Sequence, residues 1–98
     1  MLHIINKSPL ERNCLDACLA AAQAGGAVLL IEDAVYAATK GNAAAAKLQA
    51  AQSRLKFYIL QPDLEARGMA DRLMDGITAV DYGGFVDLAA EHTCQSWL

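Results

Sequence analysis

The sequence has no apolar run that approaches the roughly 20 residues of a membrane-spanning helix. Its start, MLHIINKSPL, also lacks the basic leader and longer apolar stretch of an export signal, so we expect a cytoplasmic protein without a membrane segment. Charged side chains make up only 19% of the chain, and the net charge is −3. This balance excludes the basic surface that direct binding to nucleic acid requires.

Cysteine is scarce, and the three cysteines are an odd number. Without an export signal, this argues against a disulfide framework, and free thiols are expected. Glycine is missing from the segment Asn6-Lys7-Ser8-Pro9-Leu10 that follows the first apolar run. A flavin phosphate needs a glycine-rich loop with free amides at that place, so we expect no flavin and no other cofactor.

What the chain has in excess is apolar side chain. The 98 residues have room for one domain, spanning residues 1–98. Hydrophobic residues make up 55% of them, and the mean hydropathy is +0.22. A domain of this size has little interior in proportion to its surface, so a partner is expected to cover part of the apolar surface. Alone, the chain would be a candidate for homo-oligomers.

Four short apolar runs predict strands: Leu2–Ile5, residues 27–31, residues 55–60 and Ile77–Val80. The second is an unbroken run without polar alternation, as in a strand covered on both faces of a parallel sheet. Helical patterns separate these runs. The sequence therefore predicts a three-layer α/β domain with a mostly parallel sheet of four to five strands and helices on both sides.

Two helix starts compete after the first run. Ser8-Pro9-Leu10-Glu11 has the form of a capping box, and Asn13-Cys14-Leu15-Asp16 offers a second cap. The second is favoured because apolar residues follow it at helical spacing, namely Leu15, Cys18, Leu19 and Ala22. Further helical segments are predicted at residues 34–40, 43–54, 62–68 and 69–75, with a last amphipathic face formed by Phe85, Leu88, Ala89 and His92.

Five segments in order carry a resemblance to a known family: His3-x-x-Asn6-Lys7-Ser8-Pro9, Glu32-Asp33 with Val35-x-Ala37, Asp63-Leu64-x-Ala66-Arg67-Gly68, Asp81-Tyr82-x-x-Phe85-Val86-x-Leu88, and Gln95-Ser96-Trp97-Leu98. Together they resemble the DsrH/TusB family from end to end. The resemblance implies a flavodoxin-like (DsrEFH-like) fold. It also implies a heterohexamer with DsrE/TusD-like and DsrF/TusC-like subunits, which passes persulfide sulfur to a DsrC/TusE-like carrier for sulfur oxidation or for 2-thiolation of wobble uridine in tRNA.

Cys18 is the expected sulfur-handling thiol, because a cysteine at this place resembles the DsrH proteins of sulfur oxidisers, whereas TusB proteins commonly lack it. The resemblance at Cys18 therefore favours the sulfur-oxidation branch of the family. Sulfur transfer needs a reachable, ionised thiol. Cys14 lies one helical turn earlier on the same face and is a possible second thiol. In the DsrE/TusD relatives the main sulfur-carrying cysteine lies shortly before a turn like Ala66-Arg67-Gly68, where this chain has none. The chain is thus expected to be an accessory subunit and not an enzyme on its own.

Alternative interpretations remain open. Cys18 can instead be a small core residue, which leaves a purely structural subunit of the same complex. Cys14, Cys18, His92 and Cys94 do not follow zinc-site spacing, so no metal is expected. Glu32-Asp33 is interpreted as a solvated turn or helix cap, and His3 as a satisfied core histidine. The terminal Trp97-Leu98 either folds back on its own domain or docks into a neighbour.

Overall fold

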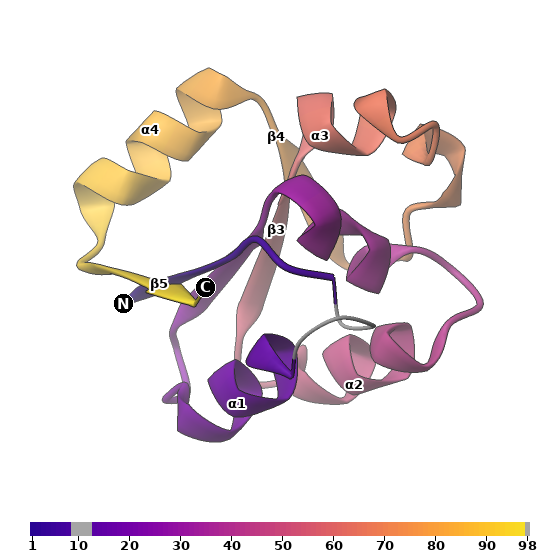
Figure 1. Cartoon of the computed structure of the whole chain (residues 1–98). Helices are drawn as coiled ribbons and strands as arrows, with labels where there is room; N and C mark the ends of the chain where they lie inside the picture. The colour runs from indigo at the N-terminus through magenta and orange to yellow at the C-terminus, as the bar shows by residue number, and fades with distance from the viewer. Residues whose placement is uncertain (9–12, 98) are drawn as a thin grey trace.

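The computed structural model describes residues 1–8 and 13–97. Its strands are β1 (Leu2–Ile5), β2 (Ala27–Leu30), β3 (Lys56–Leu60), β4 (Ile77–Val80) and β5 (Cys94–Trp97). Its α-helices are α1 (Cys14–Ala21), α2 (Ala43–Ala51), α3 (Gln61–Ala66) and α4 (Tyr82–Glu91), and two 3₁₀ helices are η1 (Glu32–Ala38) and η2 (Ala70–Arg72) (Figure 1).

The strands form one five-stranded sheet in the order β4-β3-β2-β1-β5, and every pair in it is parallel. This confirms the predicted α/β fold with its parallel sheet. The four predicted runs are strands, and β2 ends one residue earlier than expected. The fifth strand was not assigned from the residue pattern, because Cys94–Trp97 has neither a long apolar run nor a clear alternation.

The direction of the chain across the sheet decides where the helices lie. From β1 through β2 and β3 to β4, the chain moves steadily one way, and right-handed crossovers then keep the connecting helices on one face. The step from β4 to β5 runs back across the sheet, so the same handedness places α4 on the opposite face. Figure 1 shows α1 and α2 together at the bottom of the view and α4 at the upper left, on the other side of the sheet from them.

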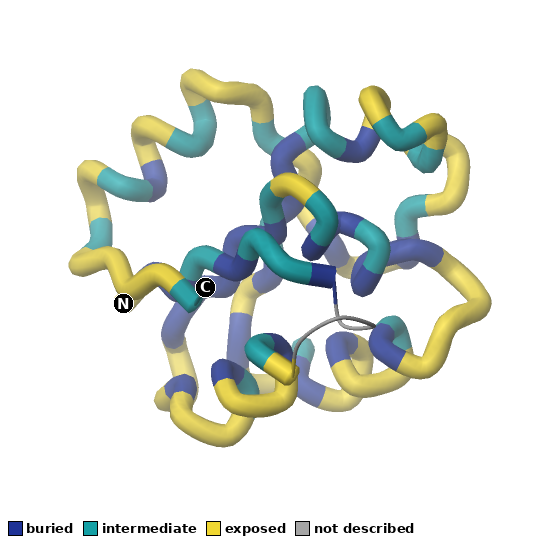
Figure 2. The backbone as a smooth tube through the Cα atoms, viewed as in Figure 1, coloured by how far each residue is buried: buried dark blue, intermediate teal, exposed yellow. Residues whose placement is uncertain are grey.

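The buried side chains divide in the same way. The larger cluster has 19 residues, to which α1, α2, η1 and α3 contribute. The smaller cluster has four, Leu2, Ala27, Leu29 and Leu88, of which only Leu88 comes from a helix. Figure 2 shows α4 mostly exposed or half-buried along its length. Half-buried apolar residues border the small cluster, among them Ile4, Tyr58, Val80 and Phe85.

The capping residues in the sequence mark some of the helix starts correctly. The start at Cys14 confirms the preferred prediction, although the Asn13 side chain makes no capping hydrogen bond. The competing start at Ser8-Pro9-Leu10-Glu11 falls largely outside the described residues. Asp81 caps α4 by accepting a hydrogen bond from Gly84 N at 2.8 Å.

Two helical predictions were wrong in kind or extent. In place of the predicted helix at 34–40 there is a 3₁₀ helix, η1, that begins earlier, at Glu32, and ends at Ala38. The predicted helix at 69–75 is only the short 3₁₀ helix η2. Their alanines and polar residues favour helix in general, but the pattern cannot separate a 3₁₀ helix from an α-helix. None of the helices in the described part of the chain is long and apolar enough to cross a membrane.

Candidate functional site

Cys18 lies in the interior, on the face of α1 that packs against the sheet. Its exposed fraction is 0%, and it belongs to the larger apolar cluster. Burial raises the pKa of the thiol to about 11, although the Arg54 guanidinium acts in the opposite direction. At pH 7 a thiol with that pKa is ionised in about one molecule in 10,000. The Cys18 thiol is therefore neither exposed nor readily ionised in the isolated chain, and its part in sulfur handling stays a prediction.

Arg54 binds the carboxyl end of α1, the helix that carries Cys18. Its guanidinium donates hydrogen bonds to the carbonyl oxygens of Leu19, at 2.6 Å, and Ala22, at 3.0 Å. The last carbonyls of a helix have no partners within the helix, and a cation there also opposes the negative end of the helix dipole. Arg54 thus fixes the end of α1 against the end of α2 and holds the helix that carries Cys18 in place.

The other two cysteines are more accessible and also free. Cys14 is half-buried and packs against the larger cluster, so the prediction that it shares a face with Cys18 is confirmed. Cys94 lies in β5 and is exposed. Among the described residues, no group of three or more His, Cys, Asp or Glu side chains is placed to hold a metal ion. Two of the thiols thus lie one turn apart on α1, and the third lies in β5.

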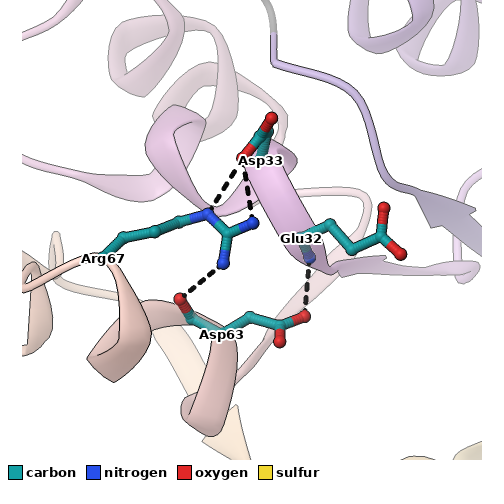
Figure 3. Close-up of polar contacts among 4 residues, drawn as sticks. All are labelled: Glu32, Asp33, Asp63 and Arg67. Carbon is teal, nitrogen blue, oxygen red and sulfur yellow. Dashed lines mark hydrogen bonds and ion pairs between the residues drawn. The ribbon is translucent and has the colours of Figure 1, made fainter.

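At the carboxyl end of the sheet, the polar residues form a structural clamp. Arg67, the residue that follows α3, donates from Nε and Nη2 to Asp33 Oδ1, at 3.0 and 2.9 Å, and from Nη1 to the Asp63 carbonyl, at 3.0 Å. The Asp63 carboxylate accepts the Glu32 backbone N–H at 2.7 Å. Figure 3 shows these contacts joining α3 to the start of η1, with the Glu32 carboxylate turned away from them.

The clamp holds an unusual backbone position. Glu32 has φ +49°, and it is the one non-glycine residue with positive φ in the described chain. Such a conformation costs about 1–2 kcal/mol, and the hydrogen bond from Asp63 together with the Arg67–Asp33 ion pair stabilises it. Glu32-Asp33 is thus the turn that the sequence predicted, and the carboxylates of Asp33 and Asp63 are occupied in holding it. The long-range role of Arg67 left no local signal in the sequence.

Among the described residues, the most exposed large apolar side chains lie on α4. Tyr82 is 61% exposed and Val86 is 66% exposed, one helical turn apart. The small cluster on the same side of the sheet is bordered by Phe85, Tyr58 and Val80, which are only half-buried. We call Tyr82 and Val86 the α4 face. Sequence reasoning predicted an excess of apolar surface, but it did not locate that surface.

The fold and these features define a small parallel α/β protein with a well-packed interior, a buried helix thiol and an apolar surface on one side. A family model described as "DsrH like protein" matches residues 7–95. The chain therefore belongs to the DsrH-like family, as its sequence motifs indicated.

Curated relatives support the same placement. The chain is 38% identical to Protein TusB of Pectobacterium parmentieri over 95 residues, which cover 97% of each chain. It is 37% identical over 95 residues to Protein TusB of Escherichia coli O81 (strain ED1a), again covering 97% of each.

Two solved structures share the fold. One is MTH1491 of Methanobacterium thermoautotrophicum, a protein of unknown function, with a TM-score of 0.71, 17% identity and coverage of 97% of this chain and 95% of that one. The other is Tm0979 of Thermotoga maritima, with a TM-score of 0.66, 20% identity and coverage of 94% of each chain. At such identities they support the fold, including the parallel sheet, and nothing further.

Proposed function

We propose that the chain is a cytoplasmic, TusB-type subunit of a sulfur-relay complex, to which it contributes structure and contact surface in place of a persulfide-carrying thiol. The family is part of a sulfur-relay system. Relatives that carry the TusB name at 37% and 38% identity favour the branch that thiolates tRNA wobble uridine over sulfur oxidation. The burial of Cys18, at 0% exposure, is the observation that carries the structural role.

The physical reason lies in the reactive species. Sulfur transfer requires a thiolate that reaches the outer sulfur of a persulfide. Cys18 meets neither condition in the isolated chain, since apolar residues surround it and burial raises its pKa to about 11. Cys14, one helical turn nearer the start of α1, is half-buried, whereas Cys18 is buried.

The proposed partners are DsrE/TusD-like and DsrF/TusC-like subunits in a heterohexamer, together with a DsrC/TusE-like carrier. Their docking site on this chain is the α4 face. A related subunit is a suitable occupant because exposed aromatic and aliphatic side chains are the residues that the cores of protein interfaces bury. Contact with tRNA is left to another component, in keeping with the net charge of −3.

Assembly is tested by co-expression with TusC-like and TusD-like proteins followed by size-exclusion chromatography. We expect one species that contains all three chains. Separate elution of this chain from the other two would defeat the proposed membership of the complex.

A second candidate function is persulfide handling on Cys18 after a partner has uncovered it. The observation in its favour is the Arg54 guanidinium, whose charge lowers the pKa of Cys18 against the effect of burial. Mass spectrometry of the assembled complex after incubation with a persulfide donor separates the two functions. The structural role predicts no sulfur on Cys18, whereas one added sulfur atom that is lost in Cys18→Ser and kept in Cys94→Ser establishes the second function.

A further inference from the structure

The two ends of the described chain are joined by one side-chain hydrogen bond that the proposed function does not use. Trp97 Nε1 on β5 donates to His3 Nδ1 on β1 at 3.1 Å. Their ring centroids are 6.1 Å apart, with the ring planes tilted by 42°. His3 is only 4% exposed, and Trp97 is half-buried. The predicted core histidine is thus confirmed, and Trp97 folds back on its own domain.

The bond fixes the protonation state of His3. An indole N–H can only donate, so the imidazole nitrogen that faces it carries no proton and the neutral ring holds its proton on Nε2. Protonation would put a second N–H at Nδ1, and two donors would then point at each other across 3.1 Å. The hydrogen bond exists only while His3 is neutral.

The surroundings of His3 favour the neutral ring. Its register partners in the neighbouring strands are Val28 in β2 and Gln95 in β5, both uncharged. Burial lowers the pKa of His3 from 6.5, because the charged ring loses contact with water. The positive amino group of Met1 lowers it further.

A groove beside His3 lets its imidazole exchange a proton with water. His3 lines a groove of about 430 Å³ beside the ends of β1 and β5. From the α1 side its walls are uncharged, formed by Ala21, Gln23 and Ala24. The imidazole is therefore buried enough to prefer the neutral form and close enough to water to exchange its proton.

The strand that this bond holds has few other attachments. β5 is an edge strand whose one neighbour in the sheet is β1. Three of its four residues, Cys94, Gln95 and Ser96, are exposed. Since Leu2 N donates to Thr93 O, alternate residues face β1, and the backbone groups of Cys94 and Ser96 point away from the sheet. Besides the pairing with β1, the Trp97 side chain attaches this strand through its hydrogen bond to His3 and its packing against the larger cluster.

We propose that His3 and Trp97 form a pH-sensitive latch, which keeps the end of β5 on the sheet while His3 is neutral and loosens it when His3 is protonated. The sign follows from linkage. Because the folded state holds the proton less tightly than the unfolded state, the contribution of His3 to stability is complete above pH 6.5. It is lost as the pH falls from 6.5 through the lower folded-state pKa.

Trp97 is the only tryptophan in the chain, so its fluorescence reports on the latch directly. In the full-length chain we expect one transition in emission as the pH is lowered, with a midpoint below 6.5. Quenching by acrylamide, which is uncharged, should become stronger below that midpoint. In His3→Asn, which keeps an acceptor near the Nδ1 position without titrating, the transition should disappear. His92→Asn, which alters the only other histidine, should leave it unchanged.

The latch would be overturned by any of three results: a transition that persists in His3→Asn, a midpoint at or above 6.5, or acrylamide quenching that does not change with pH. If His3→Asn does not fold, NMR of the unaltered chain decides the matter. The imidazole signals of His3 and the indole N–H signal of Trp97 should titrate with the same midpoint, and independent titrations would contradict the latch.

Discussion

The two faces of the sheet are packed very differently. The face that carries α1 and α2 belongs to a buried cluster of 19 residues, whereas the face under α4 has a buried cluster of four. The cause is topological, because three of the four crossovers run in one direction and only the last returns. The difference indicates that the chain stabilises itself mainly through the first face, and the more exposed second face is the one on which we propose that a partner docks.

The largest expected effect comes from the same substitution made on each face. Leu48→Ala removes a side chain of α2 that is 0% exposed, and we expect it to lower the free energy of unfolding by about 2–5 kcal/mol. Leu88→Ala on α4, at 8% exposure in the small cluster, should lie at or below the lower end of that range. Urea denaturation measures both. An equal loss at the two positions would contradict the difference between the faces.

A smaller effect is expected at Cys18, which belongs to the densely packed face. Cys18→Ser places a hydroxyl among apolar residues and should cost about 1–3 kcal/mol. Cys94→Ser, at an exposed position, should change the free energy of unfolding by no more than about 0.5 kcal/mol.

The same pair can be compared by thiol labelling with iodoacetamide in the native state. Cys94 should react first, and Cys18 should react only as the chain unfolds or as the pH approaches 11. Labelling of Cys18 at neutral pH, at a rate close to that of Cys94, would show that this side of the molecule opens readily.

The smallest effect on stability is expected on the α4 face. Val86→Lys changes a side chain that is 66% exposed, so the free energy of unfolding should move by no more than about 0.5 kcal/mol. Its effect on assembly should be large, because a charge would be buried at the interface. The measurement is co-elution with the TusC-like and TusD-like partners, with Lys47→Ala on α2 as the control on the other face. Unchanged assembly of Val86→Lys would place the partner elsewhere.

The sequence predicted four of the five strands because each of them, the edge strand β4 included, is a short apolar run. The runs at Leu2–Ile5 and Ile77–Val80 were placed to the residue. The edge strand β5 escaped because it is exposed on both sides and polar at Gln95 and Ser96, so it has no apolar pattern. It is a strand because it pairs with β1 and because Trp97 bonds to His3, and both contacts depend on residues more than ninety positions away.

The candidate site was predicted less well, for a similar reason. The helical spacing of Cys18 indicated which face of α1 it lies on, but that face is the buried one, so the same signal fits a core residue and a reactive thiol. The ion pair between Arg67 and Asp33 spans 34 positions and has no local signature. The family motifs did mark both residues, and the structure shows that they hold a turn at the carboxyl end of β2.

The central claim is that this chain supplies a surface to its complex and not a thiol. The most direct measurement is the rate of sulfur transfer from the assembled complex to its DsrC/TusE-like carrier, compared between the unaltered chain and Cys18→Ala. We expect equal rates once assembly has been matched by size-exclusion chromatography. A rate that falls to the background of the reaction without this subunit, with the complex still intact, would contradict the claim.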